Sequence, residues 1–217
     1  MSQTIIILFS LCFIVHSQEV SRVPQEGKSF TAMAVSNLSE RQLYYRKGRK
    51  FIPLQLNART RSQSYSLTGV KKLSIYTESA GSEPPYTLLT EHPLVEGTDK
   101  MLFFFSEQQT EGCAQLRLLG IDDSFDAFPT NSFRVVNFVA KSFNVTLGSK
   151  TYRLKPGIPL IHSSGVEGSS GYSLPFLLKD MGGEIISGTR LFTHSRTRET
   201  VLILPRKDKL RVLHLSN

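Results

Sequence analysis

Few residues of this sequence are of a type and spacing that could perform nucleophilic catalysis. The stretch HSSGVEGSSGYS, residues 162–173, places His162 beside several serines, which are the residue types of a Ser–His pair. It lacks the Gly-x-Ser-x-Gly pattern of a nucleophile elbow and the strand-turn-helix pattern that surrounds one. Cys113 lies beside Glu111, and a neighbouring carboxylate disfavours the reactive thiolate. We therefore predict no catalytic residue, although a hydrolase whose groups lie far apart in the sequence stays an alternative.

Metal and cofactor sites are equally poorly supported. Apart from His16 near the N-terminus, the histidines are single, with no partner at a ligand spacing: His92, His162, His194 and His214. Three aspartates, Asp122, Asp123 and Asp126, lie close together, but they do not form a regular oxygen-ligand loop for Ca²⁺. No Gly-rich loop opens a helix to hold a phosphate. We predict neither a metal site nor a cofactor.

The basic stretch YYRKGRKF, residues 44–51, is the strongest candidate for binding. It carries Arg46, Lys47, Arg49 and Lys50 between aromatic residues, in a region (41–72) with nine Lys or Arg and no Asp or Glu. Aromatic and basic residues together can bind single-stranded nucleic acid. The apolar N-terminal residues 5–15 predict export from the cell, which argues against that partner. We therefore predict a solvated hairpin tip, which in an exported protein could contact anionic polymers of the cell envelope or phospholipid headgroups.

The N-terminus predicts export. Residues 5–15 are an apolar run, interrupted only by Ser10, of the length of a signal-peptide core and too short for a membrane span. We predict a signal peptide over residues 1–17, cleaved near Ser17, an N-terminal segment over 18–27, and a periplasmic or secreted location in a bacterium. Cleavage removes Cys12 and leaves Cys113 without a disulfide partner. The alternative is a buried N-terminal strand. We predict no transmembrane span.

The rest of the chain reads as short strands. In FNVTL, residues 143–147, apolar and polar side chains alternate with the period of a half-buried strand. Similar segments rich in β-branched or aromatic residues recur along the chain: KLSIYT, MLFFFS, QLRLLGI, FRVVNFV, TVLIL and KLRVLHL. No long window has the apolar stripe of a helix, so we predict an all-β protein.

The two halves of the chain repeat one pattern. With a shift of 100 residues the following pairs coincide: Val35 with Val135, Asn37 with Asn137, Gly48 with Gly148, Lys50 with Lys150, and Leu54 with Leu154. We predict an internal duplication that gives two tandem immunoglobulin-like β-sandwich units, over residues 28–121 and 132–217, joined by a linker over 122–131. The paired glycines are expected in turns that bar a Cβ, and the paired asparagines in turns where they hydrogen-bond their own backbone.

One stretch carries a resemblance. FRVVNFVAKSFNVTLGSKTYRLKPG, residues 133–157, resembles the opening of exported bacterial β-sandwich domains, with the following residues carrying the likeness: Arg134, Asn137, Gly148, Leu154, Pro156 and Gly157. The first half matches only faintly, because Ala34 replaces the Arg and no Pro-Gly follows Leu54. The resemblance implies an exported sandwich and supplies no catalytic residue.

These features lead to two functional hypotheses. The first is a non-catalytic exported protein with a structural or protein-interaction role in the bacterial cell envelope. The alternative is a binding module for anionic or carbohydrate envelope polymers that uses the basic hairpin tip. The expected partner is thus an envelope protein or an anionic polymer, and not nucleic acid.

Overall fold

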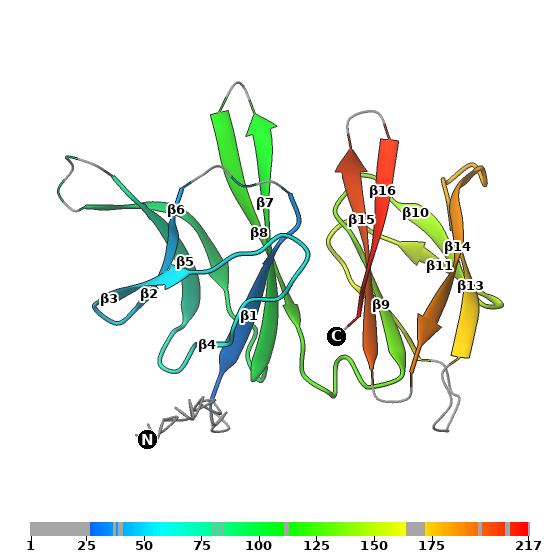
Figure 1. Cartoon of the computed structure of the whole chain (residues 1–217), viewed down its shortest axis with the longest axis horizontal. Coiled ribbons are helices and arrows are strands. Elements are labelled where there is room, and N and C mark those ends of the chain that lie inside the picture. The colour runs from blue at the N-terminus through cyan, green and yellow to red at the C-terminus, as the bar shows by residue number, and fades with distance from the viewer. Residues whose placement is uncertain are drawn as a thin grey trace, which may run out of the picture.

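The computed structural model describes residues 27–36, 38, 41–79, 81, 83, 85–110, 113–163, 172–194, 197–206 and 209–216. Within these residues the chain forms sixteen β-strands and no helix, which confirms the prediction of an all-β protein. The strands form four sheets, which follow one another from left to right along the long axis of the molecule (Figure 1). The predicted signal peptide and residues 18–26 lie outside the described residues. Within the described part there is no helix with the length and apolar character needed to cross a membrane.

The first two sheets form the first sandwich. Its outer sheet contains, in spatial order, β3 (Lys50–Leu54), β2 (Leu43–Lys47), β5 (Lys72–Glu78) and β6 (Tyr86–Pro93). Its inner sheet contains β4 (Tyr65–Ser66), β1 (Ser29–Ala34), β7 (Lys100–Thr110) and β8 (Cys113–Asp122). All neighbours are antiparallel except β1 and β7, which pair in parallel.

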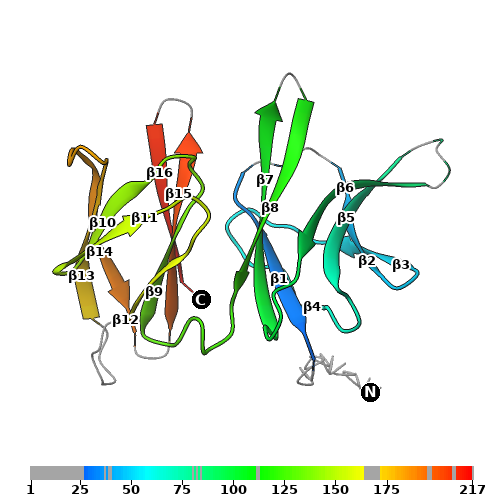
Figure 2. The same cartoon turned by 180° about the vertical axis from the view of Figure 1, so that it is seen from behind.

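The second sandwich has the same plan. Its inner sheet contains β12 (Leu160–Ser163), β9 (Ser132–Asn137), β15 (Arg198–Arg206) and β16 (Lys209–Ser216), with β9 and β15 parallel. Its outer sheet contains β11 (Lys150–Leu154), β10 (Phe143–Leu147), β13 (Tyr172–Lys179) and β14 (Ile185–Thr193). Figure 2 shows the two inner sheets facing each other in the middle of the molecule.

The equivalence of the two halves extends to irregularities in the sheets. A β-bulge lies between Ile75 and Tyr76 where β5 pairs with β6, and another lies between Leu178 and Lys179 where β13 pairs with β14. Bulges occupy specific positions in a sheet because they alter its local twist. The register also places Ala34 at the end of β1, where Asn137 ends β9. The sequence comparison had paired Asn137 with Asn37, which lies outside the described residues.

Each sandwich has a core made by alternating side chains. In β10 the odd-numbered residues 143, 145 and 147 are fully buried, as the period of two requires. Phe30, Tyr45 and Phe103 pack in the first core, where the Phe30 ring meets that of Tyr45 edge to face at 5.2 Å and that of Phe103 at 5.5 Å. Aromatic contacts of this geometry add to the free energy gained by burying apolar area.

A third core joins the two sandwiches. It is formed by residues of both inner sheets that point away from their own sandwich: Met33, Leu102, Phe104, Ile121, Val136, Leu202 and Leu204. Strands β7 and β15 are therefore buried on both faces, which explains their unbroken apolar runs MLFFF and VLIL. The sandwiches form one packed body rather than two domains joined by a flexible tether.

The predicted linker takes part in this packing. It connects β8 to β9, and its residues Asp123 and Phe128 are 5% and 0% exposed. Asn131, in the same connection, has a positive φ of 59°. The segment is thus a partly buried joint in which Phe125 and Asp126 stay exposed, although the sequence shows only its acidic and Pro-containing character.

Candidate functional site

The basic stretch forms the tip of the β2–β3 hairpin. Lys47 pairs with Lys50 across a two-residue turn, whose first residue, Gly48, has a φ of 60°. A residue with a Cβ is strained in this conformation, whereas glycine is not. Gly148 has a φ of 63° in the matching β10–β11 turn. Neither glycine has another group within 4 Å of the position of a Cβ, so backbone conformation and not space selects glycine.

The four cations of the tip point to two faces of the hairpin. Arg46 lies on the outer face, where its Nε donates to the Gly48 carbonyl at 3.0 Å and its guanidinium lies 5.9 Å from the Phe51 ring. Lys47 lies on the other face, and its Nζ donates to Ser66 Oγ at 2.8 Å. Among the described residues none of the four forms an ion pair with a carboxylate. Lys47 and Lys50 stand directly opposite each other, an arrangement that destabilises a sheet.

Four aromatic rings lie beside the tip on the outer face of the first sandwich. We call Tyr44, Phe51, Tyr76 and Tyr86 the aromatic cluster. Phe51 stacks on Tyr86 with ring centroids 3.9 Å apart and an interplanar angle of 10°. Phe51 also meets Tyr76 edge to face at 5.0 Å, and Tyr44 meets Tyr86 at 5.2 Å. All four side chains are half-buried, so the cluster stays partly open to solvent.

Glu78 borders the aromatic cluster. The Tyr44 hydroxyl donates to Glu78 Oε1, and this hydrogen bond, with smaller contributions from burial and the Glu78 charge, raises the pKa of Tyr44 to about 12. Tyr44 therefore stays protonated and neutral at physiological pH. The outer face consequently has a cation, Arg46, at one side and a carboxylate at the other, with aromatic rings between them.

The matching hairpin of the second sandwich shows which residues of the β2–β3 hairpin the fold itself requires. In the β10–β11 hairpin, Thr146 and Thr151 stand opposite each other where the first sandwich has Arg46 and Phe51, and their hydroxyls are 3.0 Å apart. Leu147, fully buried, takes the position of Lys47, and only Lys150 keeps a charge. The same hairpin thus forms without the basic tip and without the aromatic cluster.

The asparagine turn of the second sandwich is built as a side-chain-stabilised turn. Asn137 is fully buried, its Oδ1 accepts from the Val139 N–H at 2.9 Å, and its Nδ2 donates to the Lys141 carbonyl at 2.8 Å. Its own carbonyl accepts from the Gly157 N–H at 2.8 Å. These bonds satisfy the polar groups that burial of Asn137 removes from water.

His162 contacts a tyrosine in the described structure. Its Nδ1 lies 2.8 Å from the Tyr152 hydroxyl, and burial, with a smaller contribution from Lys150, lowers its pKa. The Ser163 hydroxyl lies 3.2 Å from that of Ser132. Ser164, Ser169 and Ser170 lie outside the described residues, and the Ser173 hydroxyl accepts from Arg190 Nη2 at 3.0 Å. His162 therefore has a structural partner within the second sandwich.

The remaining candidate groups are dispersed. His92 accepts from the Gly120 N–H through Nε2 at 3.3 Å, and His214 Nε2 lies 3.0 Å from Glu199 Oε2. Cys113 is the first residue of β8, and its side chain lies outside what the structure describes. The described residues contain no group of three His, Cys, Asp or Glu side chains that could hold a metal ion.

A buried charge cluster connects the two sandwiches, and sequence reasoning missed it. Asp123 accepts from Arg134 Nη2 at 2.8 Å and from Nη1 and Nη2 of Arg61, and Arg198 Nη2 lies 3.7 Å away. Arg134 is 1% exposed and its guanidinium lies 4.1 Å from the Phe128 ring. The members of the cluster come from the first sandwich, the joint, β9 and β15. Because they are far apart in the sequence, no local motif indicates the cluster.

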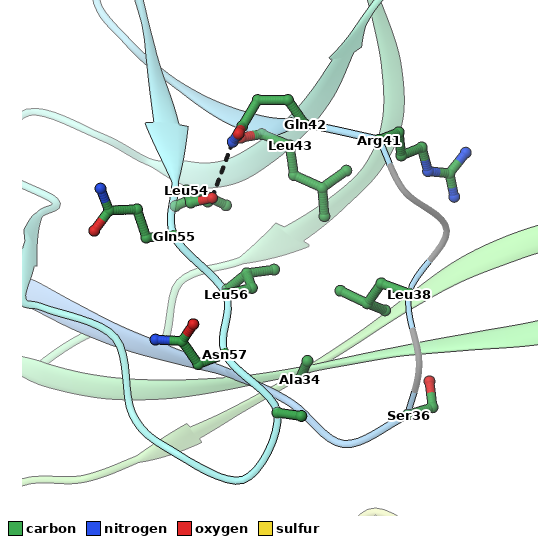
Figure 3. A pocket seen from close by; sticks show the side chains of 11 residues that line it. Ala34, Ser36, Leu38, Arg41, Gln42, Leu43, Leu54, Gln55, Leu56 and Asn57 are labelled. Atoms are coloured by element: carbon green, nitrogen blue, oxygen red, sulfur yellow. Dashed lines mark hydrogen bonds between the residues drawn. The ribbon is translucent and has the colours of Figure 1, made fainter.

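A groove of about 670 Å³ opens at one end of the first sandwich, between the segment before β2 and the segment after β3. Figure 3 shows Leu38 and Leu56 pointing toward each other across it, whereas Arg41 points away. Arg41 pairs instead with Glu107 at 2.7 Å. Among the described residues, those that line the groove include no carboxylate, serine–histidine pair or other combination suited to catalysis.

No model of a known protein family matches the sequence, and no curated protein matches it. The candidate site is therefore interpreted from its own geometry. That geometry combines a basic hairpin tip with an aromatic face, which are features of binding surfaces, whereas the groove lies at the other end of the β2–β3 hairpin, beside Leu43 and Leu54.

Proposed function

We propose that this protein is a non-catalytic exported protein of the bacterial cell envelope that binds an anionic polymer through the β2–β3 hairpin tip. One observation carries the proposal. The tip places Arg46, Lys47, Arg49 and Lys50 together without a described carboxylate partner, whereas the matching hairpin of the second sandwich has Lys150 alone. Like charges gathered beyond the needs of folding destabilise a hairpin, so their presence favours a role in binding.

We also propose that the two sandwiches arose by duplication of one immunoglobulin-like unit. Three observations support this history: the same strand order in both halves, the same parallel pair of the first and seventh strands of each half, and bulges at matching positions. After duplication, one copy is free to keep the scaffold residues while the other acquires a binding surface. The difference between the two hairpin tips fits this division.

Chromatography on immobilised heparin tests the anion-binding proposal. We expect the protein to be retained and to elute with salt, because exposed charges are screened at high ionic strength. Replacement of the four cations of the tip by Ser should abolish most of this retention. The matched control replaces four exposed cations of the second sandwich by Ser and makes the same change in net charge: Lys150, Arg153, Lys155 and Arg190. Equal loss in both variants, or no salt-sensitive retention of the unchanged protein, would contradict the proposal.

A second candidate function, interaction with an envelope protein, is favoured by the edge strand β14. Ile185 and Phe192 are each 60% exposed on this strand, which has no partner on its outer side within the described sheet. An exposed apolar edge can accept a strand from another chain. We expect affinity capture with the tagged protein from the cell envelope to recover a reproducible partner. The double variant Ile185→Lys with Phe192→Lys should fail to recover this partner. Recovery unaffected by these changes would place the interaction elsewhere.

A further inference from the structure

Charged and aromatic side chains follow one another in a fixed spatial order on the surface that extends from the basic tip across the outer sheet. Arg46 stands opposite Phe51, Tyr44 opposite Tyr76, and Glu78 opposite Tyr86. A cation, an aromatic face and a carboxylate therefore follow one another along the outer sheet. Leu88, opposite Tyr76 and 46% exposed, extends the apolar part of this face.

This arrangement is not a requirement of the fold. The matching residues of the second sandwich are Asn144 for Tyr44 and Thr151 for Phe51, with Lys179 opposite Asn144 where Tyr76 stands opposite Tyr44. That outer sheet forms the same pairings with no aromatic residue at these three positions. None of the four rings of the aromatic cluster belongs to one of the three apolar cores of the described residues. The cluster is therefore available to a ligand.

We infer that the anionic ligand is an acidic glycan, whose sugar rings contact the aromatic cluster while its acidic groups bind the hairpin tip. This inference rests on the proposed function of the tip and specifies its ligand. The C–H face of a pyranose ring packs against an aromatic face, and guanidinium groups such as Arg46 and Arg49 bind carboxylate or sulfate with two parallel hydrogen bonds. The surface supplies both kinds of group side by side.

Glu78 distinguishes a glycan from other polyanions. A carboxylate accepts hydrogen bonds from sugar hydroxyls and has capacity beyond the one bond it accepts from Tyr44. The same carboxylate repels a polymer with a phosphate at every unit, such as polyphosphate, which also offers no apolar ring face and few donors. A glycan with spaced acidic groups satisfies the aromatic rings, the cations and the carboxylate together.

The test compares heparin oligosaccharides with inorganic polyphosphate, both measured by calorimetry on the full-length exported protein. The variant Tyr44→Asn with Phe51→Thr introduces the residues that the second sandwich has at these positions, so the sheet is expected to tolerate them. We expect this variant to bind heparin at least tenfold more weakly and polyphosphate without change. The control Phe192→Thr alters an exposed ring on β14 and should leave both affinities unchanged.

The outcomes separate the inference from the proposed function. If heparin binding is unchanged in the double variant, the glycan inference is overturned while anion binding by the tip stands. If neither probe binds the unchanged protein, the proposed function itself fails. Single-stranded DNA is a third probe. If DNA binds more tightly than heparin and its binding depends on Tyr44 and Phe51, the glycan inference is overturned in favour of a nucleic-acid ligand.

A second measurement covers the case in which the double variant does not fold. The chain has seven Tyr and no Trp, so its fluorescence reports tyrosines directly. Three of those tyrosines, Tyr44, Tyr76 and Tyr86, belong to the aromatic cluster. Saturating heparin oligosaccharide should change this emission in the unchanged protein, and polyphosphate should not. Identical responses to both probes would overturn the inference.

Discussion

At the scale of single residues, Asp123 shows how one carboxylate can hold distant parts of a chain together. Burial alone raises the pKa of Asp123, but the hydrogen bond from Arg61 and the charges of Arg134, Arg61 and Arg198 outweigh it, so the pKa lies below its ordinary value. Burial has the opposite effect on the guanidinium of Arg134 and lowers its pKa to about 10, against the attraction of Asp123. Each charge is tolerated because the other is present.

Replacement of Asp123 by Asn is expected to destabilise the protein by about 3 kcal/mol, because it leaves three guanidinium groups without their carboxylate. The stability that Asp123 contributes should be complete above the pKa of an unfolded aspartate, about 3.9, and should decrease as the pH falls through its lower folded pKa. Urea unfolding between pH 7 and pH 2 measures both effects.

The control for this prediction is Asp126→Asn. Asp126 lies in the same connection but is exposed, so its loss should change the free energy of unfolding by less than about 0.5 kcal/mol. An equal effect of the two substitutions would mean that the arginines around Asp123 do not depend on its charge.

At the scale of elements, the two hairpins β2–β3 and β10–β11 show that similar turns can support different surfaces. Both turns have a glycine with a φ near 60°, and both are flanked by buried Leu residues at the far ends of the strands, Leu54 and Leu154. Between these constraints the side chains of the tip are free to differ. The proposed binding residues therefore lie where the fold does not fix the identity of the side chain.

Gly48→Ala and Gly148→Ala should each destabilise the protein by about 1 kcal/mol, because alanine in the left-handed region is strained by this amount. The two effects should be similar, since neither site has a neighbour that a Cβ would meet. Thermal unfolding of both variants measures them. Gly48→Asn serves as the control, because asparagine tolerates this conformation, and should cost less than Gly48→Ala. A large difference between the two alanine variants would indicate a contact at one turn.

At the scale of the whole molecule, the main feature is that strands β7 and β15 of the inner sheets are buried on both faces. Phe104 is 1% exposed in the core between the sandwiches, where its ring meets that of Phe138 at 5.3 Å. This core and the Asp123 cluster connect the sandwiches by two different means, one apolar and one charged. We expect such a connection to make the two sandwiches unfold together.

Calorimetry should therefore show one unfolding transition for the unchanged protein, with calorimetric and van't Hoff enthalpies equal. Phe104→Ala should lower the free energy of unfolding by about 3–5 kcal/mol, the usual cost of a buried Phe→Ala change, and should separate the transition into two. The control is Phe176→Ala, a buried ring in the second core, which should lower stability without separating the sandwiches. Two transitions in the unchanged protein would contradict this view.

The fold could be predicted where its cause is local. The alternation in residues 143–147 and the glycine at each tip act within a few residues, and they gave the correct strands and turns. The apolar run of residues 101–105 indicated a strand, but nothing near it indicated that a second sandwich covers its outer face. The segment after β8 was expected to be a linker. The burial of Asp123 within it could not be predicted, because the arginines that contact Asp123 lie up to 75 residues away in the sequence.

The candidate site was partly predictable for the same reason. Arg46, Lys47, Arg49 and Lys50 are neighbours in the sequence, so their charge was visible there. Tyr76 and Tyr86 were missed, because they reach Phe51 only through the pairing of β2, β5 and β6. An aromatic residue on the solvent face of each strand was the one available signal.

By itself, the sequence determined the all-β class and the basic, glycine-closed tip, because side-chain alternation and a positive φ depend on adjacent residues. Only the tertiary structure decided the parallel pairing of β1 with β7, the core shared by the sandwiches and the union of the aromatic cluster with the tip. These features depend on contacts between segments far apart in the chain, and the packing of whole sheets selects them.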